Sequence, residues 1–303
     1  MQQRTKRPAS TKTAAATALI VLASALSACG GGGGGGGSSG GTPTATVTSM
    51  SVNASKYYST ATVTINGSGL DSSLAVSSAA CSGMTLASGG TATTASYTCL
   101  AHGALSGTVV AKSNGTQVGS ATFTVPAPVV RLAINNGLSA VGNIDLTLAP
   151  DKAPTTVDNF LAYVTAGFYS NTIFHRIVPG FVAQGGGYSA PVTDLSTATL
   201  KTGLLPAIGY ENSGLSNTTN SIAMAATGSG AVTSQFFINS VNNTQLDGHY
   251  TVFGAITAGA SVESAILAAP ANCTTSVVDV AGDTETDCLP NPNVVITSAT
   301  QIQ

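Results

Sequence analysis

The stretch at residues 174–186, FHRIVPGFVAQGG, carries side chains that could do chemistry together. Arg176 stands between two phenylalanines, and Gln184 and a pair of glycines follow it. Beyond the first 28 residues the chain holds two arginines, Arg131 and Arg176. A sequence that uses arginine so sparingly does not need one here for solubility. A fixed cation beside aromatic side chains can stabilise electron density that develops on a bound group, and we expect this stretch to form such a site.

Two later segments combine residues of the same kinds. They are SQFFIN at 234–239 and LDGHYTVFG at 246–254. Together and in this order, the three segments resemble the cyclophilin family of peptidyl-prolyl cis-trans isomerases, especially its exported bacterial members, and the resemblance runs over residues 142–268. It implies an enzyme that rotates X-Pro peptide bonds in proline-containing polypeptides. It also implies no cofactor and no metal, and we expect a monomer.

The resemblance also assigns roles to single residues. Rotation about an X-Pro bond breaks amide resonance, against a barrier of about 18–20 kcal/mol, and needs no covalent intermediate. Arg176 is implied to be the catalytic residue, donating to the prolyl nitrogen once the amide is twisted, which favours the transition state over the ground state. Phe181 and Gln184 are implied to act beside it. The residues implied to bind the substrate are Val182, Ala225, Ala226, Gln235, Phe237, Leu246 and Tyr250.

His175, the neighbour of Arg176, invites the alternative of a general base. Amide rotation transfers no proton, and successive residues of a strand point to opposite faces. We therefore predict that His175 is a packed structural residue. The same alternation places Met224 and Phe236 in the core instead of the site.

The second half of the chain, residues 127–303, shows a mainly β pattern with two helices, which is typical of a closed barrel with helices over its ends. The resemblance implies a cyclophilin-like barrel of eight strands. A helix is expected from Thr155 or Thr156, either of which can cap it, to a left-handed C-cap at Gly167. The second helix is expected at 261–269, and the strands at 129–135, 142–148, 173–178, 181–184, 221–225, 234–239, 250–256 and 293–299.

Residues 44–126 are built from short Thr/Val/Ser alternations. Period-two patterns of β-branched residues with Asn-Gly turn signals, such as Asn66-Gly67 and Asn114-Gly115, predict a small antiparallel β-sandwich, Ig-like in class. Its one histidine, His102, is interpreted as a surface or loop residue. The sequence Pro126-Ala127-Pro128 marks a boundary between this domain and the barrel.

The first 28 residues are typical of a bacterial signal peptide, with a basic start and a short apolar run. The run is too short to span a membrane. It ends in Leu-Ser-Ala-Cys-Gly, which resembles a lipobox and predicts lipidation of Cys29; an ordinary signal peptide is the alternative. Residues 29–43 then form a Gly/Ser-rich tether. We expect a cell-envelope lipoprotein, routed to the outer membrane and facing either the periplasm or the cell surface.

Removal of this leader takes away four basic residues and no acidic ones, which leaves six basic against twelve acidic residues. So few cations cannot neutralise a phosphate backbone, which argues against nucleic-acid binding. Four cysteines remain, and we expect disulfides between Cys81 and Cys99 and between Cys273 and Cys288, as is usual in an oxidising compartment. A zinc site is the alternative, but the chain has no CxxC motif.

Three further points stay open. Residues 271–290, longer than the usual link to the last strand of the family, are interpreted as a disulfide-stapled loop of unknown purpose. The barrel could be a binding module that grips proline-containing segments without catalysis, although a mere scaffold has no need of Arg176 and Gln184. The sandwich could itself be the functional part, as an adhesin or a docking domain.

Overall fold

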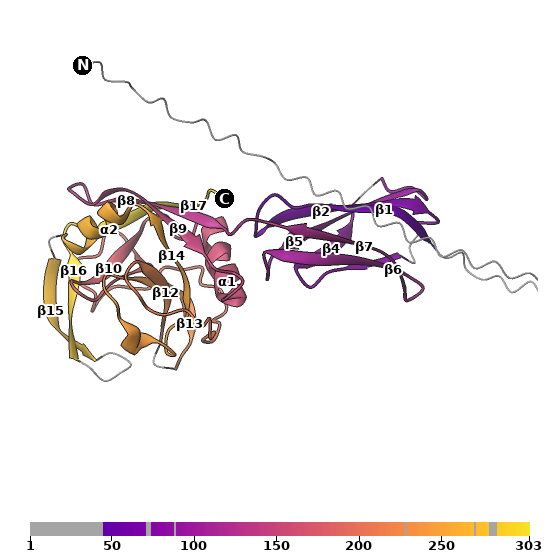
Figure 1. Ribbon diagram of the computed structural model, residues 1–303. Helices are drawn as coiled ribbons and strands as arrows, with labels where there is room; N and C mark the ends of the chain where they lie inside the picture. The colour runs from indigo at the N-terminus through magenta and orange to yellow at the C-terminus, as the bar shows by residue number, and fades with distance from the viewer. Residues whose placement is uncertain (1–44, 71–73, 88, 228, 270, 279–283) are drawn as a thin grey trace, which may run out of the picture.

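The computed structural model describes residues 45–303, apart from 71–73, 88, 228, 270 and 279–283. The predicted leader and tether, including Cys29, lie outside the described residues. So do the side chains at 272–278 and 284–287, where the backbone alone is described. Figure 1 shows two β-rich parts in sequence order, one before residue 126 and one after it.

The N-terminal part consists of two antiparallel sheets, as the alternating pattern predicts. The first has the strand order β1-β2-β5-β4 and comprises β1 (Thr46–Asn53), β2 (Ser59–Ser68), β5 (Thr94–Ala101) and β4 (Cys81–Leu86). The second has the order β3-β6-β7 and comprises β3 (Leu74–Ser77), β6 (Ser106–Ser113) and β7 (Thr116–Thr124). On the central strand β2, every second residue from Ala61 to Ile65 is fully buried, so the hydrophobic face of that strand forms the interior.

The C-terminal part is a closed barrel with the strand order β10-β11-β13-β12-β14-β9-β8-β17, which confirms the predicted fold. Neighbouring strands pair antiparallel all the way round. The strands are β8 (Val129–Asn135), β9 (Val141–Leu148), β10 (Thr172–Val178), β11 (Val182–Ser189), β12 (Ser221–Ala226), β13 (Val232–Asn239), β14 (Val252–Ala258) and β17 (Val294–Gln301). A short 3-10 turn, η1 (Thr244–Leu246), lies between β13 and β14.

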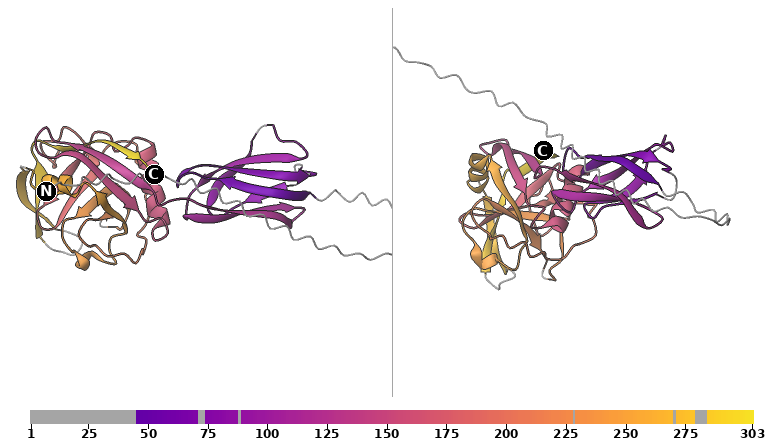
Figure 2. Two further views of the ribbon diagram at one scale, coloured as in Figure 1. Left: turned by 45° about the horizontal axis from the view of Figure 1, so that its top comes forward. Right: turned by 45° about the vertical axis from the view of Figure 1, so that its right-hand side comes forward.

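Two helices cover this barrel, as predicted. Helix α1 (Pro154–Thr165) buries the stripe of Val157, Phe160 and Leu161 and lies toward the N-terminal sheets in Figures 1 and 2. It ends at Thr165 with Ala166 as its C-cap, and Gly167, the expected C-cap, is the left-handed residue that follows, with φ +67°. The expected threonine cap is wrong.

The start of α1 is capped from outside the helix. Its N-cap residue is Ala153, which offers no side-chain hydrogen bond. The carboxylate of Glu211 accepts the N–H groups of Thr155 and Thr156 at 3.2 and 2.9 Å instead. An anion at this end also complements the helix dipole. The second helix, α2 (Ala260–Leu267), follows Gly259, which has φ +88°.

Two paired strands stand on either side of residues 279–283, where a loop was expected over 271–290. They are β15 (Ala271–Val278) and β16 (Thr284–Pro290), paired antiparallel with Cys273 opposite Cys288. Figure 1 shows these strands on the side of the barrel away from the N-terminal sheets, with β16 beside β10.

Candidate functional site

The residues predicted to do chemistry come from β10 and β11, which pair directly. Arg176 on β10 lies opposite Gln184 on β11. Side chains on directly opposed residues project from the same face of a sheet, so the guanidinium and the amide share one side of the barrel wall. The guanidinium carbon of Arg176 lies 5.8 Å from the centre of the Phe181 ring, which is within the range of a cation–π contact.

Beside this pair lies a small apolar cluster that is separate from the main core. It comprises Val182, Ala223, Phe237, Leu246 and Val252, all no more than 6% exposed, with the partly buried Phe181, Ala225 and Tyr250 packed against it. The rings of Phe237 and Tyr250 meet edge to face, with centroids 5.3 Å apart. The fold thus brings six of the predicted site residues from five separate segments to one place: Phe181, Val182, Ala225, Phe237, Leu246 and Tyr250.

The two predicted glutamines contact each other. Gln184 Nε2 donates to Gln235 Oε1 at 3.0 Å. A glycine makes room for them, because a Cβ on Gly187 would come within 2.8 Å of the Gln235 side chain. Gln184, held by Gln235 and lying across from Arg176, therefore has a fixed position at the edge of the apolar cluster.

Neighbouring residues point the other way, as the strand alternation predicts. Phe236 and Met224 are fully buried in the main core. His175 is 5% exposed, and its ring meets that of Tyr188 at 4.8 Å. Burial, with a smaller effect of the nearby Arg176, lowers the pKa of His175 to about 4. The imidazole is therefore neutral at physiological pH and packed away from solvent.

One predicted site residue does not join the cluster. Ala226 packs against the main core, whereas Ala225 packs against the apolar cluster. Two cluster residues, Ala223 and Val252, were not predicted as site residues. Because alternate residues of a strand share a face, Ala223 could have been predicted from Ala225 on β12.

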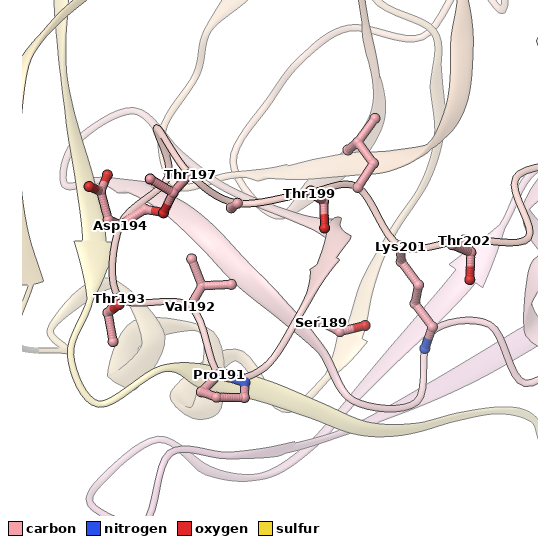
Figure 3. A pocket seen from close by; sticks show the side chains of 11 residues that line it. Ser189, Pro191, Val192, Thr193, Asp194, Thr197, Thr199, Lys201 and Thr202 are labelled. Carbon is pink, nitrogen blue, oxygen red and sulfur yellow. The ribbon is translucent and has the colours of Figure 1, made fainter.

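A hollow of about 490 Å³ lies elsewhere, inside the loop at 189–202. Figure 3 shows its lining, which is mainly hydroxyl side chains with Asp194 and Lys201. The ammonium of Lys201 is already engaged, since it donates to Ser170 O at 2.6 Å and lies 5.3 Å from the ring of Phe168. None of the lining residues belongs to the apolar cluster, so we do not treat this hollow as the site.

The cysteines favour the disulfide hypothesis over a zinc site. Cys81 and Cys99 form a disulfide, with their Cα atoms 5.6 Å apart. Cys288 is also disulfide-bonded, and the backbone register places Cys273 across from it. Among the residues the structure describes, no helix is both long and apolar enough to cross a membrane.

The barrel matches a known protein family. The family described as "Cyclophilin type peptidyl-prolyl cis-trans isomerase/CLD" matches residues 129–301, which is more than half of the chain. That range holds every strand of the closed barrel and both helices.

Individual relatives agree with this match. "Peptidyl-prolyl cis-trans isomerase A" of Dickeya dadantii is 41% identical over 134 residues, covering 42% of this chain and 67% of its own. A peptidyl-prolyl cis-trans isomerase of Acinetobacter baylyi is 39% identical over 136 residues, covering 43% and 69%. Among solved structures, a cyclophilin type isomerase of Cryptosporidium parvum superposes with a TM-score of 0.42 at 24% identity, covering 59% of this chain and 99% of its own.

Proposed function

This chain belongs to the cyclophilin type peptidyl-prolyl cis-trans isomerase family, and we propose that its barrel rotates X-Pro bonds of exported proteins by electrostatic catalysis at Arg176. The observation that carries the proposal is the apolar cluster with Arg176, Gln184 and Gln235 at its edge. Such a site can hold a proline ring by apolar contact while leaving the amide beside a cation.

The chemistry required of the site is limited. Twisting the amide destroys its resonance, so the prolyl nitrogen regains a lone pair that the planar amide lacks. A donor fixed near that nitrogen interacts with the twisted amide more strongly than with the planar one. This difference lowers the barrier, because only interactions that strengthen in the transition state accelerate a reaction.

Arg176 suits this role better than other cations would. The planar fork of an arginine can be held by one neighbour while it donates to another. The ring of Phe181 lies close on one side, and Gln184 lies opposite on the next strand.

A proton-transfer mechanism has no support from the neighbouring histidine. His175 is buried in packing with Tyr188, and its pKa is lowered to about 4. A general base works best with a pKa near the operating pH, which His175 lacks. The rotation itself requires no base.

The cellular location is part of the proposal. The lipobox-like sequence that ends at Cys29 and the Gly/Ser tether after it support an outer-membrane lipoprotein. The disulfide of Cys81 and Cys99 is in keeping with an oxidising compartment. The clients would then be exported polypeptides, met either in the periplasm or at the cell surface.

A prolyl isomerisation assay tests the activity. The protein without its leader is added to an Ala-Pro peptide, and the cis-to-trans rate is followed for the wild type and Arg176→Ala, with circular dichroism to confirm that both are folded. A wild-type rate no faster than the uncatalysed one would refute the proposal. Binding without turnover would favour the binding-module alternative.

A further inference from the structure

Three buried asparagines form a hydrogen-bonded row beside the apolar cluster. Asn217 and Asn239 are 0% exposed and Asn243 is 2% exposed. Asn243 Nδ2 donates to Asn239 Oδ1 at 2.8 Å, and Asn239 Nδ2 donates to Asn217 Oδ1 at 3.2 Å. They come from the segment before β12, the end of β13 and the residue before η1. Because buried amides are costly unless they are hydrogen-bonded, this asparagine row needs an explanation.

Asp247 fixes the direction of the asparagine row. Its Oδ1 accepts the backbone N–H of Asn217 at 2.7 Å and Asn217 Nδ2 at 2.9 Å. An ionised carboxylate can only accept, so Asn217 must turn its NH₂ toward Asp247 and its oxygen toward Asn239. Partial burial raises the pKa of Asp247, but the hydrogen bonds from Asn217 bring that pKa below its ordinary value. Every amide in the row is thereby turned the same way, and such bonds polarise one another.

The other end of the asparagine row is the backbone of Phe181. Asn243 Nδ2 donates to Phe181 O at 2.9 Å. The N–H and the hydroxyl of Ser240 donate to the same oxygen, each at 2.9 Å. Phe181 follows Gly180, which has φ +78°, in the turn between β10 and β11. This turn is therefore tied to the segment after β13 as well as to its own two strands.

Asn243 also contacts the backbone of a second residue of the cluster, Leu246. Its backbone carbonyl accepts the N–H of Leu246 at 2.9 Å, and its own N–H donates to Asn217 O at 2.7 Å. Phe181 and Leu246 both belong to the apolar cluster. One buried residue thus sets the position of both, through its side chain for Phe181 and through its main chain for Leu246.

We propose that Asn243 is a positioning residue for the prolyl pocket, and that Asp247 orients its amide through Asn217 and Asn239. This inference rests on the proposed function, because it takes the apolar cluster as the place that grips the proline ring. Asn243 is buried and acts through Phe181 and Leu246. Without its hydrogen bond, the Phe181 oxygen keeps the two donors of Ser240 but loses its tie to the asparagine row. The turn that carries Phe181 then gains freedom that peptide binding must remove, and affinity falls accordingly.

The test compares Asn243→Ala with Asn136→Ala. Asn136 is likewise buried, at 5% exposed, and its Oδ1 accepts the N–H groups of Leu138 and Ala140 in the turn between β8 and β9. Those strands are not neighbours of β11 or β13 in the barrel. Each variant loses one buried amide, so a general loss of stability is common to both. NMR line shapes of an Ala-Pro peptide give its dissociation constant and its isomerisation rate on the protein.

We expect Asn243→Ala to raise the dissociation constant by roughly threefold to tenfold, the range that corresponds to one net hydrogen bond. The isomerisation rate on the protein should change by less than about twofold. The substitution weakens the ground state and the transition state of the bound peptide equally, so it leaves the barrier between them unchanged. Asn136→Ala should lower the melting temperature and leave the dissociation constant at the wild-type value. The inference is overturned if the dissociation constant of Asn243→Ala equals that of the wild type, or if that of Asn136→Ala rises as much as that of Asn243→Ala.

A second variant, Asp247→Asn, tests whether Asp247 sets the direction of the asparagine row. It also provides a test of the inference if Asn243→Ala does not fold. An amide at this position can still offer an oxygen to the two N–H donors of Asn217, but that oxygen is neutral. It therefore holds the direction of the row less firmly than the carboxylate does. We expect the dissociation constant to rise by about twofold to fivefold, somewhat less than the loss of a whole hydrogen bond. If the dissociation constant of this variant equals that of the wild type, the role of Asp247 is contradicted.

The two proposals fail separately. If the wild type binds the peptide and does not isomerise it, the proposed function is wrong, and the dissociation constants still decide whether Asn243 positions the pocket. If the wild type isomerises the peptide and Asn243→Ala binds it equally well, the proposed function stands and the positioning role is wrong.

Discussion

The hydroxyl of Tyr57 donates a hydrogen bond of 2.6 Å to Asp158 Oδ1, which joins the N-terminal sheets to helix α1 of the barrel. His102 Nδ1 lies 2.7 Å from the other carboxylate oxygen of Asp158. From the last strand, Gln301 Nε2 donates to the backbone oxygen of Tyr57 at 2.8 Å. Tyr57 is 0% exposed, and burial and then the Asp158 carboxylate raise its pKa. The two parts of the chain therefore share a partly buried polar joint.

Tyr57→Phe should weaken this joint by about 1.5–3 kcal/mol, the value of a hydrogen bond to a charged group. Because the joint lies at α1 and Arg176, the proposed catalytic residue, lies on β10, we expect turnover to stay unchanged. Calorimetry should show the N-terminal sheets melting apart from the barrel. Tyr58→Phe is the matched control, since the hydrogen bonds to Asp158 come from Tyr57 and His102. A single wild-type transition in Tyr57→Phe would contradict the prediction.

Arg176 gives the sharpest test of the mechanism. Loss of its cation in Arg176→Ala should lower the isomerisation rate by about 10²–10³-fold, as removal of one electrostatic donor does in other enzymes. Peptide binding should fall much less, because the apolar cluster remains. Arg176→Lys keeps the charge without the planar fork and should recover part of the rate. Stopped-flow assays decide the matter, and unchanged turnover in Arg176→Ala refutes the assignment of the site.

The disulfide of Cys81 and Cys99 should contribute about 3 kcal/mol to the stability of the N-terminal sheets, since it closes a loop over a sequence separation of 18. Replacing both cysteines by alanine should lower the melting temperature of that part and leave isomerase turnover unchanged. Non-reducing peptide mapping should join Cys81 to Cys99 and Cys273 to Cys288. Recovery of all four as free thiols would show that the predicted pairing is wrong.

The sequence predicted those parts of the fold that depend on local pattern. Alternation along the barrel strands gave their positions to within a few residues, and it correctly separated Phe237 in the cluster from Phe236 in the core. In the N-terminal part it marked neither β3 (Leu74–Ser77) nor β4 (Cys81–Leu86), where few β-branched residues alternate. It also missed the paired strands β15 and β16, where little beyond two cysteines distinguishes a ribbon from a loop.

Contacts across long separations could not be predicted. The cap of α1 comes from Glu211, more than 50 residues later in the chain, whereas local rules favour a threonine at the helix start. His102 was predicted to be a surface or loop residue, and it does lie outside the strands, just after β5. Its contact with Asp158 depends on how two separate β structures meet. The asparagine row likewise has no sequence signature, because Asn217, Asn239 and Asn243 become neighbours only when the barrel closes.

The lipid anchor stays a prediction, because Cys29 lies outside the described residues. Cys29→Ser removes the one thiol that a lipobox offers for acylation, so the protein should no longer partition into the detergent phase of a cell-envelope extract. Turnover of the barrel should be unaffected, since the tether separates it from Cys29. A wild-type protein found in the aqueous phase would favour the alternative of an ordinary signal peptide.

The pH dependence separates the two interpretations of His175. Its pKa falls from the ordinary 6.5 to about 4 in the folded protein, chiefly through burial. Between these values the unfolded chain binds a proton that the folded chain does not, so stability is full above about pH 6.5 and declines as the pH falls toward 4. The decline attributable to His175 should be on the order of 3 kcal/mol, and it should be absent in His175→Gln. Turnover should stay nearly flat from about pH 6 to 8, because arginine remains charged there. Denaturant melts and rates of both proteins across this range provide the test: a bell-shaped rate profile that disappears in folded His175→Gln would mean that a proton moves in the rate-limiting step.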